Sequence, residues 1–183
     1  MKKLISLLLL LTTALSFAAC GASTPSGTTD GSGQNNNPFK DSYRNDATCT
    51  ILKDNAETKI ALPDGFEFMD KSELAVAAEP SISTIMTLLD DSAIRFTGGN
   101  SFDEYGILHV ADAENVETVK KAVGDYLQAK KEDALYRSYF PGEEYKLDEA
   151  EVKVYGNYVV YGMLDGNNRT ALFTQVKNLL LVV

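Results

Sequence analysis

The sequence predicts an α+β fold in which an antiparallel sheet of about four strands carries helices packed on one face. Alternating apolar and polar residues flank Gly156-Asn157, which is typical of a β-hairpin. Apolar residues recur at helical spacing both before and after this hairpin. Because adjacent hairpins followed by helices favour an antiparallel sheet covered on one side, we expect a β-β-α-β-β-α core with additional N-terminal helices.

The elements expected before the hairpin are two strands and a long helix. "SAIRFTG" predicts a short strand that ends at Gly98-Gly99, and "EYGILHVA" predicts a second strand. The helix follows Asp112, a candidate N-cap, and Pro141-Gly142 stops it. Its apolar positions are Val116, Val119, Val123, Tyr126, Leu127, Leu135 and Tyr139.

The remaining helical signals lie at the two ends of the folded region. Weaker ones occur around Lys71 to Ala78 and Ile82 to Leu89, and Asp46 to Leu62 is ambiguous between helix and strand, with helix favoured. After the hairpin, a turn that begins at Asp165 starts the final helix. The apolar face of that helix comprises Leu172, Val176, Leu179 and Val183.

A two-residue turn gives the hairpin two distinct faces, with Tyr155 opposite Tyr158. The face expected to meet the core carries Val152, Val154, Val159, Tyr161 and Met163. The other face carries Lys153, Tyr155, Tyr158 and Val160 and is expected to be partly open to water. Lys153, Tyr155 and Tyr158 there form a candidate patch for a peptide or glycan, and cross-strand aromatic pairing is the alternative reading.

The N-terminus has the pattern of an export signal. Lys2 and Lys3 precede an uncharged, mostly apolar run from Leu4 to Phe17, which is shorter than the roughly 20 residues that span a bilayer. Ala18-Ala19-Cys20 resembles the lipobox of bacterial lipoproteins, although Phe17 stands where leucine is usual. The resemblance implies a lipid on the thiol of Cys20 and cleavage before it. Ordinary signal-peptidase cleavage, which would release a soluble secreted protein, and a buried N-terminal helix are the alternatives.

The sequence therefore predicts three parts of the chain: a lipoprotein signal peptide at 1–19, a lipid-anchored flexible linker at 20–45 and a single α+β domain at 46–183. The linker is rich in Gly, Ser, Thr and Asn and spans roughly 25 to 30 Å. Loss of Lys2 and Lys3 with the signal moves the formal charge from −9 to −11, which disfavours nucleic acid and anionic lipid as partners. With Cys20 acylated, Cys49 has no disulfide partner and is expected to be a buried, inert thiol.

The sequence contains no recognisable catalytic, metal-binding or cofactor-binding motif. His109 is the only histidine, and alternation places it with Tyr105 and Ile107 as a half-buried strand residue. The adjacent carboxylate pairs Asp90-Asp91 and Glu143-Glu144 are expected to diverge rather than to chelate a cation. We therefore expect no catalytic residue, no metal and no cofactor.

Several segments together resemble a domain-of-unknown-function family found in lipoproteins of Gram-positive bacteria. They are the lipobox, the polar linker, "DEYGILHVAD", "VKKAVGDYLQAKKE", "YFPGEEYKL" and "VKVYGNYVVYGM". The resemblance covers roughly residues 65 to 183 and implies fold and location without any activity.

The function expected from these features is that of a membrane-anchored, extracytoplasmic lipoprotein of the cell envelope that binds a partner without catalysis. Acylated Cys20 would hold membrane lipid, and an envelope protein, peptide or glycan would be the second partner. Two alternatives are a small envelope hydrolase that uses His109 or a carboxylate pair, and a solute-binding accessory protein. About 140 residues seldom form the two lobes of a typical solute receptor.

Overall fold

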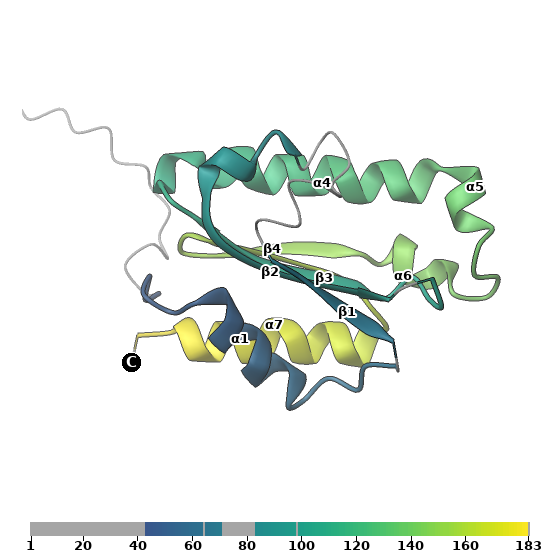
Figure 1. Cartoon of the computed structure of the whole chain (residues 1–183), viewed down its shortest axis with the longest axis horizontal. Coiled ribbons are helices and arrows are strands. Elements are labelled where there is room, and N and C mark those ends of the chain that lie inside the picture. Colours follow the sequence, from purple (N-terminus) through teal and green to yellow (C-terminus); the bar gives the residue numbers. More distant parts are fainter. Residues whose placement is uncertain (1–42, 64, 71–82, 98, 183) are drawn as a thin grey trace, which may run out of the picture. The chain divides into compact units, whose positions relative to one another are not determined.

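The computed structural model describes residues 43–63, 65–70, 83–97 and 99–182. Five antiparallel strands form one sheet in the order β1-β2-β3-β5-β4. Helix α4 lies on one face of the sheet, and helices α1 and α7 lie on the other (Figure 1). Cys20, the signal segment and the expected helix at 71–78 fall outside the described residues.

The strands in chain order are β1 Phe66–Asp70, β2 Leu89–Thr97, β3 Glu104–Val110, β4 Glu151–Tyr155 and β5 Tyr158–Met163. The α-helices are α1 Cys49–Glu57, α4 Val116–Glu132, α5 Ala134–Arg137, α6 Glu144–Asp148 and α7 Gly166–Leu180. Two 3₁₀ turns, η2 Met86–Leu88 and η3 Ala113–Asn115, precede β2 and α4.

The predicted β-β-α-β-β-α order from β2 to α7 is confirmed, as is the α+β class, with the short helices α5 and α6 as additions. The hairpin register is also confirmed, since Tyr155 pairs with Tyr158 and Val152 pairs with Tyr161 across Gly156, whose φ is +60°. The helix favoured between residues 46 and 62 is confirmed as α1. Strand β1 was not expected, and it pairs with β2 at one edge of the sheet.

The prediction that helices pack on only one face of the sheet is wrong. Both faces of the sheet carry apolar residues, and helices cover both. Every residue of β3 is buried. Leu108 and Val110 pack under α4, while Tyr105 and Ile107 pack under α1 and α7. A strand that is apolar on both faces has to be covered on both, since each side chain left in water would forfeit about 1.5 to 3 kcal/mol.

The long predicted helix is divided at Asp133. Helix α4 ends at Glu132, and the Asp133 carboxylate accepts hydrogen bonds from the backbone N–H groups of Leu135 (2.8 Å) and Tyr136 (3.1 Å). This N-cap starts the separate helix α5, because aspartate competes for backbone donors better at a helix start than inside one. The predicted N-cap Asp112 opens η3 without a side-chain capping bond, and α4 begins at Val116.

The first described residues are attached to the C-terminal end of α7. Tyr43 forms an antiparallel bridge with Leu181, and the Arg44 N–H donates to the Leu180 carbonyl at 2.8 Å. Thr48 then caps α1, where its hydroxyl accepts from the Ile51 N–H at 3.2 Å. The chain therefore enters this domain beside the end of its last helix.

Gly106 in β3 allows the ring of Tyr161 to lie across the strand. The two residues are direct partners between β3 and β5, and a Cβ added at Gly106 would overlap that ring. The Tyr161 hydroxyl reaches past Gly106 to the Glu104 carboxylate, to which it donates at 2.7 Å. The absence of a side chain at 106 is thus a requirement of this packing.

We expect Gly106→Ala to lower the free energy of unfolding by about 3 kcal/mol, because neither the ring nor the strand can move aside in a packed core. Urea unfolding would measure the loss. Gly124→Ala in α4 is the matched control: its Cβ meets no atom within 4 Å and should stabilise the helix by about 1 kcal/mol. Equal stability of Gly106→Ala and the wild type would contradict the packing described.

Candidate functional site

The candidate patch of Lys153, Tyr155 and Tyr158 is not an exposed surface in the structure. Tyr158 is 0% exposed and Tyr155 is 7% exposed, because α1 and α7 cover this face of the hairpin. The Tyr158 hydroxyl donates to the Ala47 carbonyl at 2.7 Å. Lys153 extends over the Phe173 ring at 4.4 Å. The two tyrosines help to hold helices against the sheet and are not available to a peptide or glycan, whereas the Lys153 side chain is 39% exposed and pairs with Glu151.

His109 is buried at the end of β3, more deeply than the half-buried position expected. Its Nδ1 lies 2.6 Å from a carboxylate oxygen of Asp90, and its Nε2 lies 2.8 Å from the side-chain oxygen of Asn45. The imidazole also stacks on Tyr158 with ring centroids 4.4 Å apart. Both ring nitrogens face protein oxygens, so the imidazole connects three segments of the chain and offers no free nitrogen for proton transfer.

Asp90 and Asp91 diverge, as predicted. Asp90 meets His109, whereas Asp91 accepts from the Cys49 N–H at 2.7 Å and from the Ser92 N–H at 2.8 Å. Burial raises the pKa of the Cys49 thiol well above its ordinary value, and the Asp91 carboxylate raises it further. The expectation of a buried Cys49 is confirmed, and a thiol in these surroundings is a weak nucleophile.

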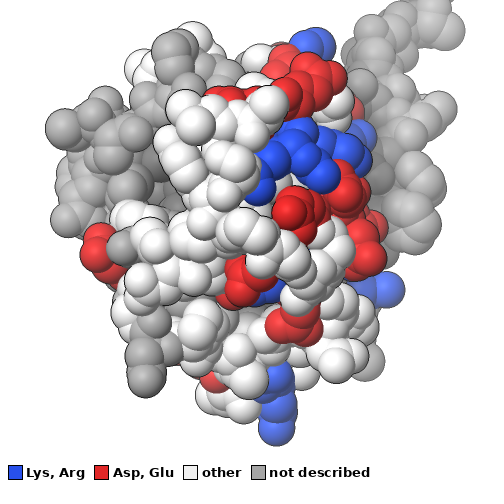
Figure 2. Space-filling view, turned by 90° about the vertical axis from the view of Figure 1, so that its right-hand side faces the viewer, with Lys and Arg blue, Asp and Glu red and all other residues white. Residues whose placement is uncertain are grey.

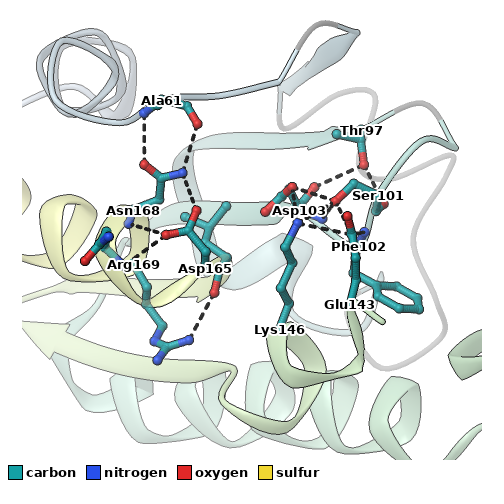
Figure 3. Close-up of polar contacts among 12 residues, drawn as sticks. Ala61, Thr97, Ser101, Phe102, Asp103, Glu143, Lys146, Asp165, Asn168 and Arg169 are labelled. Carbon is teal, nitrogen blue, oxygen red and sulfur yellow. Dashed lines mark hydrogen bonds and ion pairs between the residues drawn. The ribbon is translucent and has the colours of Figure 1, made fainter. Parts of the chain in front are cut away.

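A polar cluster that the sequence analysis did not identify lies between the start of β3 and α6 (Figure 3). The Lys146 ammonium donates to the Ser101 hydroxyl (2.9 Å), to Asp103 (2.7 Å) and to Glu143 (3.1 Å). The Ser101 hydroxyl also contacts both carboxylates. Thr97 closes the cluster by donating to the Ser101 carbonyl at 2.6 Å. Asp103 and Lys146 are buried here.

The contact between Ser101 and Lys146 raises the question of a serine nucleophile with a lysine base. A lysine base has to be neutral, which requires a lowered pKa. Burial lowers the pKa of Lys146, but the hydrogen bonds and charges of Asp103 and Glu143 outweigh burial, and the net direction is upward. Lys146 is therefore held as a cation between two carboxylates, and this cluster is built for ion pairing.

A second buried cluster joins α4 to the sheet through Glu104. One oxygen of Glu104 accepts from the hydroxyls of Tyr126 and Tyr161, each at 2.7 Å, and the other accepts from Lys130 at 2.6 Å. Burial raises the pKa of Glu104, yet the Lys130 charge and these hydrogen bonds outweigh it and lower the pKa overall. Glu104 is thus an ionised carboxylate enclosed by its partners.

Three of the five exposed large apolar side chains of the described residues lie in one segment, at the opposite end of β3 from His109. Leu135, Tyr139 and Tyr145 are 64%, 55% and 44% exposed. They belong to α5, the turn after it and α6, and we call residues 133–149 the α5–α6 surface. Figure 2 views this end of the domain, where uncharged surface adjoins a region of acidic side chains with basic ones between them.

Within the described part of the chain, no group of three or more His, Cys, Asp or Glu side chains has an arrangement that could hold a metal ion. Over the same residues, no helix combines the length and apolar character needed to cross a bilayer.

Comparison with known families adds one finding. Residues 88–164 match the family described as Domain of unknown function (DUF4358). The predicted similarity to a domain-of-unknown-function family is confirmed. The match spans β2 to β5 and includes both buried polar clusters, while α1 and α7 lie outside it. No curated protein matches the chain, and no solved structure does.

Replacing Glu104 by glutamine should cost about 3 kcal/mol at pH 7, because Lys130 then loses the charge that compensates its burial. The lowered folded-state pKa of Glu104 means that its stabilisation is complete above the unfolded value of 4.5 and is lost as the pH falls through the folded value. Urea unfolding between pH 7 and pH 3 should therefore show a smaller stability difference between Glu104→Gln and wild type at the acidic end. A constant difference would contradict the ionised state of Glu104.

Lys146→Met should also lower the free energy of unfolding by about 3 kcal/mol, because the buried Asp103 carboxylate is left without its cation. Restoring neutrality with Lys146→Met and Asp103→Leu together should recover a large part of that loss. Thermal unfolding of the two single variants and the double variant measures this coupling. Strictly additive losses would mean that the ion pair is not the reason for the burial of Lys146.

Proposed function

We propose that this chain is a lipid-anchored, extracytoplasmic lipoprotein whose domain binds another component of the cell envelope without catalysis. The observation that carries the proposal is the N-terminal pattern: Lys2 and Lys3, a short apolar run from Leu4 to Phe17, and then Ala18-Ala19-Cys20. A diacylglycerol on the Cys20 thiol and an acyl chain on its amine would give the two hydrophobic anchors that lasting attachment needs. The resemblance to lipoproteins of Gram-positive bacteria agrees with this proposal.

The contacts of the candidate catalytic groups support a binding role. His109 has both nitrogens facing Asp90 and Asn45, and Lys146 is kept charged by Asp103 and Glu143. A general base needs an unshared lone pair within reach of a substrate proton. In the described part of the chain, the nitrogens of these groups face oxygens of neighbouring segments, and these contacts hold parts of the fold together.

The position of the chain entry supports a tethered arrangement. Asn45 contacts His109 at one end of β3, whereas Lys130 and α5 lie near Glu104 at the other end. A strand of seven residues separates these ends by about 20 Å. The linker expected at 20–45 would thus join the domain at the His109 end, and the α5–α6 surface lies at the other end of β3.

Expression of the chain in a Gram-positive host should yield a membrane-bound protein that lacks residues 1–19 and carries a diacylglycerol on Cys20. Mass spectrometry of the N-terminal peptide and fractionation of the cells would measure both. Cys20→Ser should abolish the lipid and change the fractionation, whereas Cys49→Ser should leave lipidation intact because that thiol lies in the core. An unmodified Cys20 in the mature wild-type protein would refute the proposal.

A further inference from the structure

We infer that the α5–α6 surface is the docking site for a cationic polypeptide segment with apolar side chains. The inference rests on the proposed function, because it names the surface and the partner class of the binding module. It depends on the exposure, rigidity, charge and position of residues 133–149.

The α5–α6 surface is short, yet it contains most of the exposed large apolar side chains of the described residues. Five large hydrophobic side chains are exposed in the described part of the chain, and three of them fall between Leu135 and Tyr145. The other two, Ile51 and Val182, belong to α1 and to the end of the chain. Exposed tyrosines grouped in one short segment are typical of interfaces, where aromatic side chains contribute much of the binding energy.

The α5–α6 surface is held rigidly by contacts beneath and across it. Tyr136 and Phe140, which flank Tyr139, pack against Phe102 with ring centroids 5.2 and 4.8 Å apart. Arg137 of α5 pairs with the carboxylate of Asp148 in α6 through bonds of 2.8 and 3.3 Å. Because these contacts already fix the backbone, a partner would lose little affinity to ordering of this segment.

The charge of this surface fits a cationic partner. Asp133 and Glu144 of this surface, and Glu132 beside it, accept hydrogen bonds from neutral amide groups, of Gln128 and of the backbone. Arg137 pairs with Asp148, and residues 133–149 contain more acidic than basic side chains. The domain after the signal peptide carries a formal charge of −11. Tyrosine rings add a second attraction, since a lysine or arginine over the ring face contributes about 0.5 to 1 kcal/mol at an exposed site.

The domain already contains a lysine, Lys130 near the end of α4, that contacts tyrosine rings and a carboxylate together. The Lys130 ammonium lies 4.5 Å from the Tyr126 ring centroid and 5.0 Å from that of Tyr136, while it pairs with Glu104. A lysine of a partner placed between Tyr139 or Tyr145 and the neighbouring carboxylates would repeat this combination of ring and carboxylate at the surface. Apolar residues of the same segment would cover Leu135.

The α5–α6 surface does not lie where the linker is expected to join the domain. The linker joins at Asn45, beside His109, and the α5–α6 surface lies beyond the other end of β3.

The test uses residues 20–183 with Cys20→Ser, since every described contact lies within residues 43–182. Thermal unfolding first checks that this protein folds. An end-blocked pentapeptide of alternating lysine and leucine is then titrated while amide signals are followed by NMR. We expect perturbed signals in residues 133–149, and at least tenfold weaker binding for the Tyr139→Ser, Tyr145→Ser double variant. Leu135→Ser replaces the double variant if that protein unfolds.

Three controls make the outcomes decisive. Ile51→Ser removes an equally exposed apolar side chain from α1 and should leave the affinity unchanged. A pentapeptide with glutamate in place of lysine should not bind, and equal binding would overturn the charge argument. Perturbation of residues 133–149 by chitotetraose instead of the cationic peptide would identify a glycan surface and overturn the inference, as would unchanged peptide binding by the double variant.

Failure here is separable from failure of the proposed function. The lipid on Cys20 is measured by mass spectrometry in cells and does not depend on the peptide titration. An acylated chain whose α5–α6 surface ignores the cationic peptide would refute only this inference. A chain without lipid would refute the tethered location even if the peptide bound.

Discussion

The enclosed carboxylate of Glu104 is the contact on which the placement of α4 depends. Apolar packing under this helix is strong but has little directional preference, so Val119 and Val123 alone would tolerate small sliding movements. Glu104 removes that freedom, because its oxygens need Tyr126 and Lys130 from the helix at hydrogen-bond distance. A buried charge whose partners shift away costs several kcal/mol, and this penalty fixes one position of α4 along the sheet.

The neighbouring residue extends this constraint to α6. Asp103, directly before β3, pairs with Lys146 of α6, while Glu104 pairs with Lys130 of α4. Two adjacent carboxylates thereby fix the end of α4 and the start of α6. The chain between them, which includes α5, has its ends held and its apolar residues Leu135 and Tyr139 facing outward.

Local patterns in the sequence predicted local structure well. The Gly156-Asn157 turn specifies its own register, and the apolar spacing from Val116 to Leu127 specifies a helix without knowledge of its neighbours. The burial of Tyr155 and Tyr158 could not be predicted in this way, because the helices that cover them, α1 and α7, come from opposite ends of the domain. Alternation shows that a strand has two faces but does not show that both are covered.

The polar clusters escaped prediction for the same reason. The partners of Glu104 lie 22, 26 and 57 residues away along the chain, so no short motif contains them. The break at Asp133 was missed because a periodic apolar pattern continues through it to Tyr139, although aspartate at that point favours a new cap. Charged residues flanked by aromatic ones, as Asp103 and Glu104 are by Phe102 and Tyr105, are a signal in the sequence that favours such clusters.

The bridge between Tyr43 and Leu181 has a mechanical consequence. A pull on the chain from its N-terminal side would load the hydrogen bond from Arg44 to Leu180 and the contact of Asn45 with His109 before any strand pair. These contacts would break one after another and lengthen the free N-terminal segment while the five strands stay paired. Tension on the N-terminal segment would thus break a few peripheral hydrogen bonds, and the core of the domain would remain unstrained.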